Sequence, residues 1–345
     1  MWRGLLVLVL ALGCRRVERT TGGRGLGDAG VAACGSLGAR GRAPALARDQ
    51  GGTLYAGWIA DGVVRVAARR AETACWQPLG APAPPPPPGM PPALDQLALA
   101  GGAAGEVVAR WVTPLGVWQA ARFAGGRWRA LALPPSTLVS VVWASRWVVV
   151  SMTETVGGPV AVSVLAEEAG DWRSAGRLEW GVAPGGAGLS AERLAVASDG
   201  TRVALAAVVC SFRFSPWCRL RVALADGAGL REVGAEAAHD PEQALFVALA
   251  PGAPQPELFI GSAPVDGCDG FTLASTPGAR LARCRWSAVQ ITLVDRAGAP
   301  RSPVLEIVAL DEIAGLLDGG RAFVFSFEPS GAHVYQLAGR GWAEY

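Results

Sequence analysis

Few side chains in this sequence are of a type that performs acid–base or nucleophilic chemistry. Histidine, the commonest general base, occurs only at His239 and His333. A catalytic triad built on either one is disfavoured, because each is expected to be a turn or strand residue. The sequence contains no G-x-S-x-G, H-E-x-x-H or phosphate-binding glycine loop. This pattern favours a protein without catalysis of its own, although it leaves the question of enzyme activity open.

Cysteine is the other reactive residue type. Of the seven cysteines, Cys14 ends an apolar N-terminal run, and the other six form an even set that suits disulfides in an oxidising compartment. A structural zinc site is the alternative, and it is disfavoured because the sequence has no C-x-x-C pair. Local spacing, with elimination for the last pair, predicts the bridges Cys210–Cys218, Cys268–Cys284 and Cys34–Cys75.

Two carboxylates close together in the sequence raise the question of a metal. Asp266 and Asp269 lie on either side of Gly267, and a flexible glycine allows two carboxylates to converge on Ca²⁺. Two ligands are too few to define a site, so a plain glycine-containing turn is favoured. We therefore predict neither a metal nor a cofactor.

The stretch 105–134 shows which elements must position these residues. Val107, Ala109 and Trp111 alternate with other residues along one face of a strand. Breaks at 114–116 and 125–126 separate two further alternating runs, and 94–99 supplies a fourth. Four short antiparallel strands in about forty residues are typical of a β-propeller blade.

The same unit repeats along the chain. We predict an all-β propeller with four antiparallel strands per blade and six blades, within a range of five to eight. Most of the 13 tryptophans are expected in its core. An array of immunoglobulin-like sandwiches is the rival, and it is disfavoured because its repeat is longer. The predicted blades are 44–80, 93–134, 138–180, 189–234, 243–308 and 309–345.

The fifth unit is the least regular. Residues 289–294 and 303–308 repeat the third and fourth strands of the second unit, so 244–250 and 257–263 are assigned as its first two strands. This register makes 263–288 a long insertion between the second and third strands. Cys268 and Cys284 would then occupy the same junction as Cys210 and Cys218 in the fourth unit.

Three turns in the sequence share a pattern of aspartate followed by glycine. Asp49, Asp199 and Asp318 are each followed within two residues by glycine and then by an apolar strand. These turns distantly resemble the Asp-box turns of sialidase-type propellers, without the full spacing of that motif. The resemblance implies a structural role for the turns. Sialidase chemistry would also require a tyrosine nucleophile, and Tyr55 lies inside a predicted strand.

The N-terminus and the composition indicate export. Arg3, an apolar run over 5–12 and Gly13 before Cys14 form a signal peptide that resembles a bacterial lipobox. We expect residues 1–14 to be this signal, Cys14 to be lipidated, 15–42 to be a tether and 43–345 to be the propeller. An ordinary signal peptide or an uncleaved anchor is the alternative. With 31 basic and 29 acidic residues the net charge is +2 and no basic block occurs, so nucleic acid is not expected as a partner.

Antiparallel strands place the loops between second and third strands on the same face as the connections between blades. Elaborated loops on a rigid scaffold often carry binding. We therefore expect a scaffold or binding propeller in the bacterial cell envelope that recognises a protein or glycan through this face. The alternative is a glycan-acting hydrolase or lyase of the sialidase-like propeller type. The candidate binding residues are Arg213, Phe214, Trp217, Asp266, Asp269, Arg285 and Trp286.

Overall fold

The chain divides into two units, Met1–Ala33 and Cys34–Tyr345, and every described residue belongs to the second. The computed structural model describes residues 37, 40–70, 73, 75–82, 96–113, 115–181, 188–211, 217–236, 245–260, 262–265, 268–285, 289–309, 312–318, 320–339 and 341–345. Residues 235–236, 262–265, 268–271 and 284–285 are described by their backbone alone. The predicted signal segment, with Cys14, lies outside the described residues. None of the described residues forms a helix long and apolar enough to cross a membrane.

The first four blades are antiparallel sheets of four consecutive strands. Blade one is β1 (Arg42–Arg48), β2 (Leu54–Ala60), β3 (Val63–Arg69) and β4 (Gln77–Pro78). Blade two is β5 (Leu97–Gly101), β6 (Val107–Val112), β7 (Trp118–Ala124) and β8 (Arg127–Leu131). Blade three is β9 (Leu138–Trp143), β10 (Trp147–Glu154), β11 (Val160–Glu168) and β12 (Asp171–Trp180). Blade four is β13 (Ser190–Ser198), β14 (Val203–Ser211), β15 (Trp217–Asp226) and β16 (Gly229–Glu236).

The C-terminal half is less regular. A two-stranded sheet, β17 (Leu245–Ala248) and β18 (Glu257–Ile260), comes first. Blade five is a five-stranded sheet of β19 (Ser262–Val265), β20 (Cys268–Thr276), β21 (Ala279–Arg285), β22 (Val289–Asp295) and β23 (Leu305–Ile307). Blade six is β24 (Ile313–Asp318), β25 (Arg321–Glu328), β26 (Gly331–Ala338) and β27 (Gly341–Glu344).

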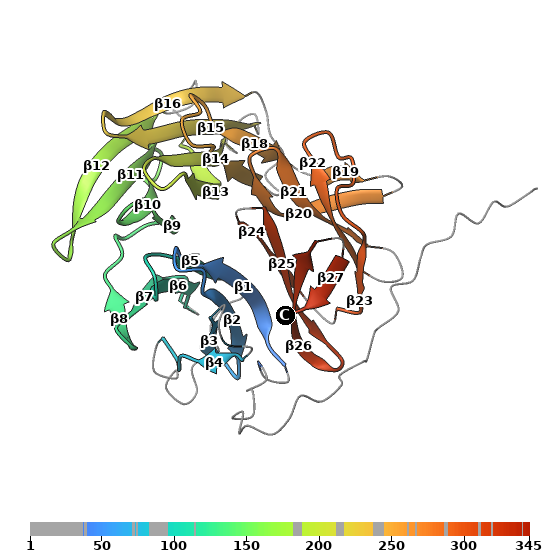
Figure 1. Ribbon diagram of the computed structural model, residues 1–345. Coiled ribbons are helices and arrows are strands. Elements are labelled where there is room, and N and C mark those ends of the chain that lie inside the picture. Colours follow the sequence, from blue (N-terminus) through green and yellow to red (C-terminus); the bar gives the residue numbers. More distant parts are fainter. Residues whose placement is uncertain are drawn as a thin grey trace, which may run out of the picture. The chain divides into compact units, whose positions relative to one another are not determined.

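The sheets of the second unit form a closed ring (Figure 1). The inner strands β1, β5, β9, β13, β17, β20 and β24 each contact the next in this order, and β24 returns to β1. Six sheets of four or five strands confirm the predicted propeller. The hairpin β17–β18 was not predicted as a separate sheet, and it adds a narrow member to the ring between blades four and five.

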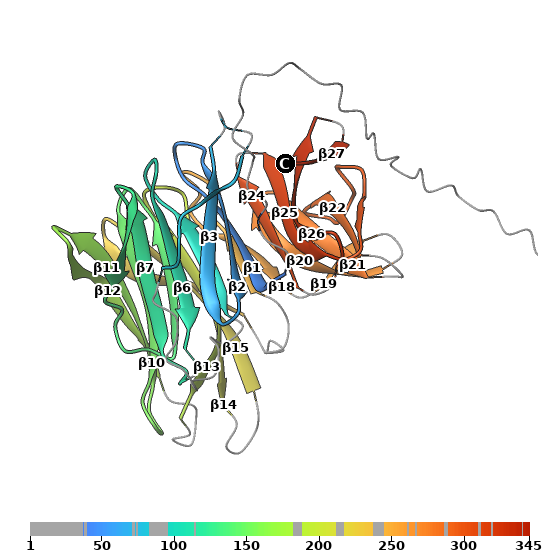
Figure 2. The same ribbon diagram turned by 90° about the horizontal axis from the view of Figure 1, so that it is seen from below.

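The strands run between two faces of the ring (Figure 2). Face 1 carries the loops that join first to second and third to fourth strands. Face 2 carries the loops between second and third strands and the connections between blades, because antiparallel strands alternate in direction. Every inner strand therefore starts at face 2 and ends at face 1.

Turn chemistry explains why these segments form hairpins. Asp61 and Gly62 join β2 to β3 with φ values of 52° and 74°, and Gly125 and Gly126 join β7 to β8 with 58° and 79°. Two successive residues with positive φ make a turn whose twist matches that of the flanking strands. Glycine, aspartate and asparagine tolerate this conformation best, so these turns could be read from the sequence.

The predicted strand register of the fifth unit was wrong. Residues 263–288 do not form an insertion, since β19, β20 and β21 occupy most of the segment and pair with one another and with β22. The turn that was missed is Gly278, whose φ is 74° and which joins two alternating runs. Cys268 therefore starts β20, an inner strand, and Cys284 lies near the end of β21. The pair does not occupy the junction predicted for it.

Side chains from facing sheets fill the space between blades. Trp147, fully buried, lies in the cluster between blades two and three, and Trp180 lies in the cluster between blades three and four. Inner strands approach one another more closely than a side chain permits at Gly101, where a Cβ would lie 2.0 Å from the carbonyl oxygen of Arg48. Gly101 therefore allows the inner strands of blades one and two to pack closely.

Candidate binding site

The structure describes few of the predicted binding residues in full. Trp217 is described with its side chain, and Asp269 and Arg285 by their backbone. The other four, which lie outside the described residues, are Arg213, Phe214, Asp266 and Trp286. These assignments stay predictions.

Trp217 begins β15 and pairs with Ser211 across the β14–β15 hairpin. Its half-buried ring packs against the core between blades three and four, and the guanidinium of Arg219 lies 5.1 Å from the ring centroid. Most of this aromatic surface is therefore used in packing, which favours a structural role for Trp217.

The disulfide beside it is as predicted. Cys210 and Cys218 pair directly across β14 and β15 and are bonded, with Cα atoms 4.0 Å apart. Cys75 also takes part in a disulfide. The predicted partner of Cys75, Cys34, lies outside the described residues, and the side chains of Cys268 and Cys284 are not described.

The Asp-containing turns at face 1 connect neighbouring sheets through hydrogen bonds. Asp49 is buried, and its carboxylate accepts hydrogen bonds from the Tyr55 hydroxyl at 2.8 Å and from the Gly105 amide of blade two at 2.7 Å. Burial, together with the hydrogen bond and negative charge of Asp49, raises the pKa of the Tyr55 phenol. A phenol held neutral in this way is a poor nucleophile.

Asp199 has a similar structural role in the corresponding turn of blade four. Burial alone would raise the pKa of its carboxyl, but hydrogen bonds from the backbone and side chains of Arg202 and Thr201 outweigh burial and lower the pKa to about 2. Arg202 in turn donates to the carbonyls of Ala250 and Ala253, in the loop that joins β17 to β18 of the next sheet. The turns that resemble Asp-boxes therefore bond neighbouring sheets to one another.

A feature of face 2 that the sequence did not single out is Arg110 on β6. Its Nη1 donates a hydrogen bond to the carbonyl oxygen of Val139, on the inner strand of blade three, at 2.5 Å. Its guanidinium lies 4.9 Å from the ring centroid of Trp118, and the indole N–H of Trp118 donates to the carbonyl of Thr137 at 3.0 Å. We call these four residues the Arg110 site.

The charge of Arg110 is not balanced by a carboxylate among the described residues. Burial lowers its pKa to about 10, so the guanidinium remains charged at neutral pH. A desolvated cation gains from a carboxylate or a hydrogen-bonded anion. Glu154, on the neighbouring blade, is directed elsewhere, since it accepts a hydrogen bond from the Ala191 amide of blade four at 2.7 Å.

Apolar side chains are also exposed on face 2 of blades two and three. Leu115 and Val117, in the β6–β7 loop of blade two, are 81% and 55% exposed. Val156, in the β10–β11 loop of blade three, is fully exposed. Exposed apolar side chains on loops of one face are available to meet a partner.

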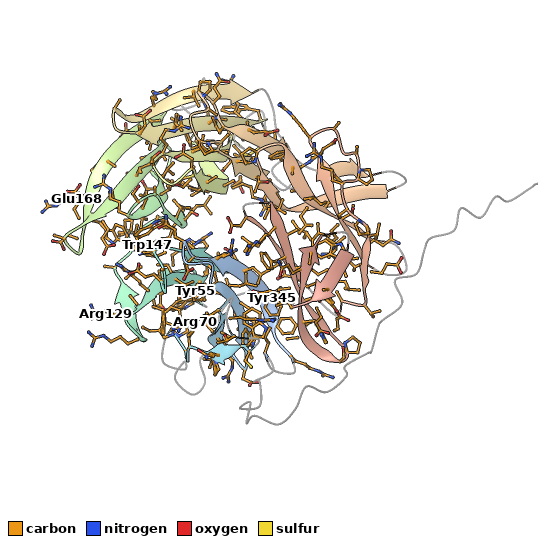
Figure 3. All side chains as sticks on the ribbon, in the orientation of Figure 1. Tyr55, Arg70, Arg129, Trp147, Glu168 and Tyr345 are labelled. Atoms are coloured by element: carbon orange, nitrogen blue, oxygen red, sulfur yellow. A yellow bond between two sulfur atoms is a disulfide. The ribbon has the colours of Figure 1, made fainter. Side chains whose placement is uncertain are left out.

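Face 1 offers a contrasting arginine site. A cavity of about 250 Å³ is lined by Arg122, Ala124, Gly125 and Arg129. Arg122 is paired with two carboxylates, Glu106 at 2.9 Å and Glu167 at 3.0 Å. Figure 3 shows Arg129 and Glu168 at the outer edge of the ring and Trp147 further inside. Because the partly buried cation of this cavity already has its counter-charges, the Arg110 site is the stronger candidate.

A hydrolase would require two carboxylates that face each other across the centre of the ring. On the described inner strands, the carboxylates with described side chains belong to Glu192 of β13 and Asp318 of β24. Glu192 lies near the face 2 end and Asp318 at the face 1 end, where it pairs with Arg48 at 2.6 Å. These two carboxylates therefore do not form the required pair. Nor do the described residues include a cluster of three or more His, Cys, Asp or Glu side chains that could hold a metal ion.

Comparisons with known proteins identify the fold. No protein-family model matches the sequence, and no curated protein matches it. The chain is similar to the BP39L lectin from Burkholderia pseudomallei, with a TM-score of 0.56, 16% identity and coverage of 88% of this chain and 97% of the lectin. The chain is also similar to the β-propeller domain of the Trilobed protease from Pyrococcus furiosus. The TM-score is 0.49 and the identity 10%, with coverage of 87% of this chain and 97% of that domain. For the six-bladed fucose-recognising lectin from Aleuria aurantia, the TM-score is 0.43 and the identity 12%, with coverage of 88% of this chain and 93% of the lectin.

Proposed function

We propose that this chain is an exported, lipid-anchored propeller that binds a carboxylate-bearing glycan on face 2. The observation that carries the proposal is Arg110, a partly buried cation without a carboxylate partner among the described residues, stacked on Trp118. A uronic acid would supply the missing charge to the guanidinium, and apolar ring faces of the sugar could pack on the exposed side chains of the neighbouring loops. Recognition of this kind requires no chemical step.

Replacing the cation tests this site. Arg110→Gln is expected to weaken binding of galacturonic acid oligomers by about tenfold to 150-fold, which corresponds to the roughly 1.5–3 kcal/mol of a hydrogen bond to a charged group. Isothermal titration calorimetry measures the change. Methyl-esterified oligomers are the matched neutral ligand and should bind the wild-type protein weakly.

The control variant is Arg127→Gln, which removes the same charge from an exposed position on β8 of the same blade. It should leave binding unchanged. Equal binding of the acidic and esterified oligomers by the wild-type protein, or equal losses in both variants, would contradict the proposal.

A protein partner is the second candidate, and the exposed Leu115, Val117 and Val156 favour it. Affinity capture from membranes with the wild-type protein, compared with a Leu115→Ser, Val156→Ser variant, separates the two candidates. A protein that is captured only by the wild type would support the second candidate. The runner-up among enzymes is the glycan-acting hydrolase or lyase, which predicts cleavage products from the same oligomers.

Membrane attachment is part of the proposal. Because the apolar run over 5–12 ends at Gly13 and Cys14, we infer that Cys14 is acylated after export. The variant Cys14→Ser is expected to move the protein from the membrane fraction to the soluble fraction, as followed by fractionation and immunoblotting. A processed Cys14→Ser protein that stays in the membrane fraction would rule out the acyl anchor.

A further inference from the structure

A hydrogen-bonded relay of three side chains lies in blade six. The β25–β26 hairpin turns through Pro329 and Ser330, and Gly331 follows with a φ of 134° that side chains rarely adopt. Ser330 Oγ lies 2.9 Å from Nε2 of His333, and Nδ1 of the same ring lies 2.6 Å from Oε1 of Glu344 on β27. Serine, histidine and a carboxylate are therefore connected in the order that nucleophilic catalysis uses.

The partners determine which nitrogen carries the proton. An ionised carboxylate only accepts hydrogen bonds, so Nδ1 of His333 must donate to Glu344. Nε2 of the neutral ring is then the acceptor, and the Ser330 hydroxyl donates to it. This is the tautomer in which histidine can remove the serine proton.

The imidazole is also held in place by its other neighbours. The ring of His333 stacks on that of Tyr335, with centroids 6.1 Å apart and planes 21° apart. Tyr335 in turn donates a hydrogen bond to the buried carboxylate of Glu328, which also accepts one from Ser326. The histidine side chain is only 19% exposed, so its orientation is constrained on several sides. Ser330, by contrast, is exposed and accessible to a substrate.

We propose that Ser330 is the nucleophile of an acyl-transfer site, with His333 as general base and Glu344 as the residue that positions it. Ser330 Oγ attacks an ester carbonyl while its proton passes to Nε2 of His333. The ester C–O bond then breaks, and the alcohol leaves with that proton. Water, deprotonated by His333, hydrolyses the acyl-serine and releases the carboxylic acid. Each turnover consumes one ester and one water and returns the relay to its starting state.

The position of the relay indicates the class of substrate. The β25–β26 loop joins second and third strands, so Ser330 lies on face 2, and Glu344 is 62% exposed. Such an open site suits a small acyl ester carried by a larger molecule, whose bulk can remain in solvent. This activity is independent of ligand binding at Arg110, which belongs to blade two.

Covalent labelling tests the nucleophile directly. A fluorophosphonate probe is expected to modify Ser330 of the purified exported protein, as located by peptide mass spectrometry. His333→Gln should slow the labelling by about 100-fold or more, because a general base contributes roughly that factor. Glu344→Gln should cause a smaller loss, because Glu344 acts through His333. Hydrolysis of p-nitrophenyl acetate should fall in the same order.

The control is Ser174→Ala, which removes another exposed serine, from β12 of blade three. This variant should be labelled at the wild-type rate. Circular dichroism confirms that each variant is folded, and Ser330→Ala, a change at an exposed turn, should lose the label with an unchanged spectrum. A wild-type protein that carries no label on Ser330, or labelling of His333→Gln at the wild-type rate, would overturn the proposal.

Discussion

Phe325→Ala is expected to lower the free energy of unfolding by about 3–5 kcal/mol, the usual cost of truncating a buried phenylalanine. The side chain is fully buried in the cluster between blades one and six. Its ring centroid lies 6.3 Å from that of Trp58 and 5.1 Å from that of Phe327. Urea unfolding monitored by tryptophan fluorescence measures the loss.

The position of Phe325 determines which part of the ring the substitution weakens. Each sheet is built from consecutive strands, so the N-terminal and C-terminal sheets share no backbone ladder where the ring closes. Side chains hold this seam, through the Phe325 cluster, the Arg48–Asp318 ion pair at 2.6 Å and the Arg69 guanidinium 3.8 Å from the Tyr345 ring centroid. Phe325→Ala should therefore open the ring between blades one and six before the other blades unfold.

Hydrogen exchange distinguishes seam opening from general destabilisation. In Phe325→Ala, amide protection should fall first in β1 and β24. The matched control is Phe259→Ala, which truncates a buried phenylalanine of β18 away from the seam. That variant should lose stability while β1 and β24 keep their relative protection. An even loss of protection along the chain in Phe325→Ala would contradict the seam.

Arg122→Met is expected to have the second largest effect. Arg122 bridges Glu106 of blade two and Glu167 of blade three, and the Trp147 indole N–H also donates to Glu106 at 3.3 Å. Without the guanidinium, two partly buried carboxylates remain near each other with no cation between them. We expect a loss of about 2–3 kcal/mol in unfolding free energy, below the full cost of breaking a buried pair because all three side chains are partly solvated.

Neutralising the carboxylates as well separates charge from packing. If repulsion and desolvation cause the loss, Glu106→Gln and Glu167→Gln introduced together into Arg122→Met should restore much of the stability. Arg177→Met, which breaks a pair with Glu179 that is more than half exposed, should change stability by about 0–1 kcal/mol. Failure of the two glutamine substitutions to restore stability would show that Arg122 acts through its packing.

Contacts within a hairpin were predictable from the sequence because they depend on local geometry. The Asp61–Gly62 turn fixes the pairing of β2 with β3, and the period of two then assigns each side chain to a face. Cys210 and Cys218 pair for the same reason, since they end adjacent strands of one hairpin. Where a turn was missed, at Gly278, the strand register of the whole fifth unit was lost with it.

Contacts between sheets were decided only by the tertiary structure. Arg110 meets Val139 on the next blade, and Asp49 of blade one meets Gly105 of blade two. Alternation in the sequence tells which face of a sheet a side chain occupies, but not which residue of the facing sheet it meets. That choice depends on how the sheets pack, because their separation and twist follow from all the side chains between them. The sequence by itself therefore determined the propeller fold and the local disulfide of this protein, whereas the Arg110 site, which joins two blades, emerged only once the blades were packed.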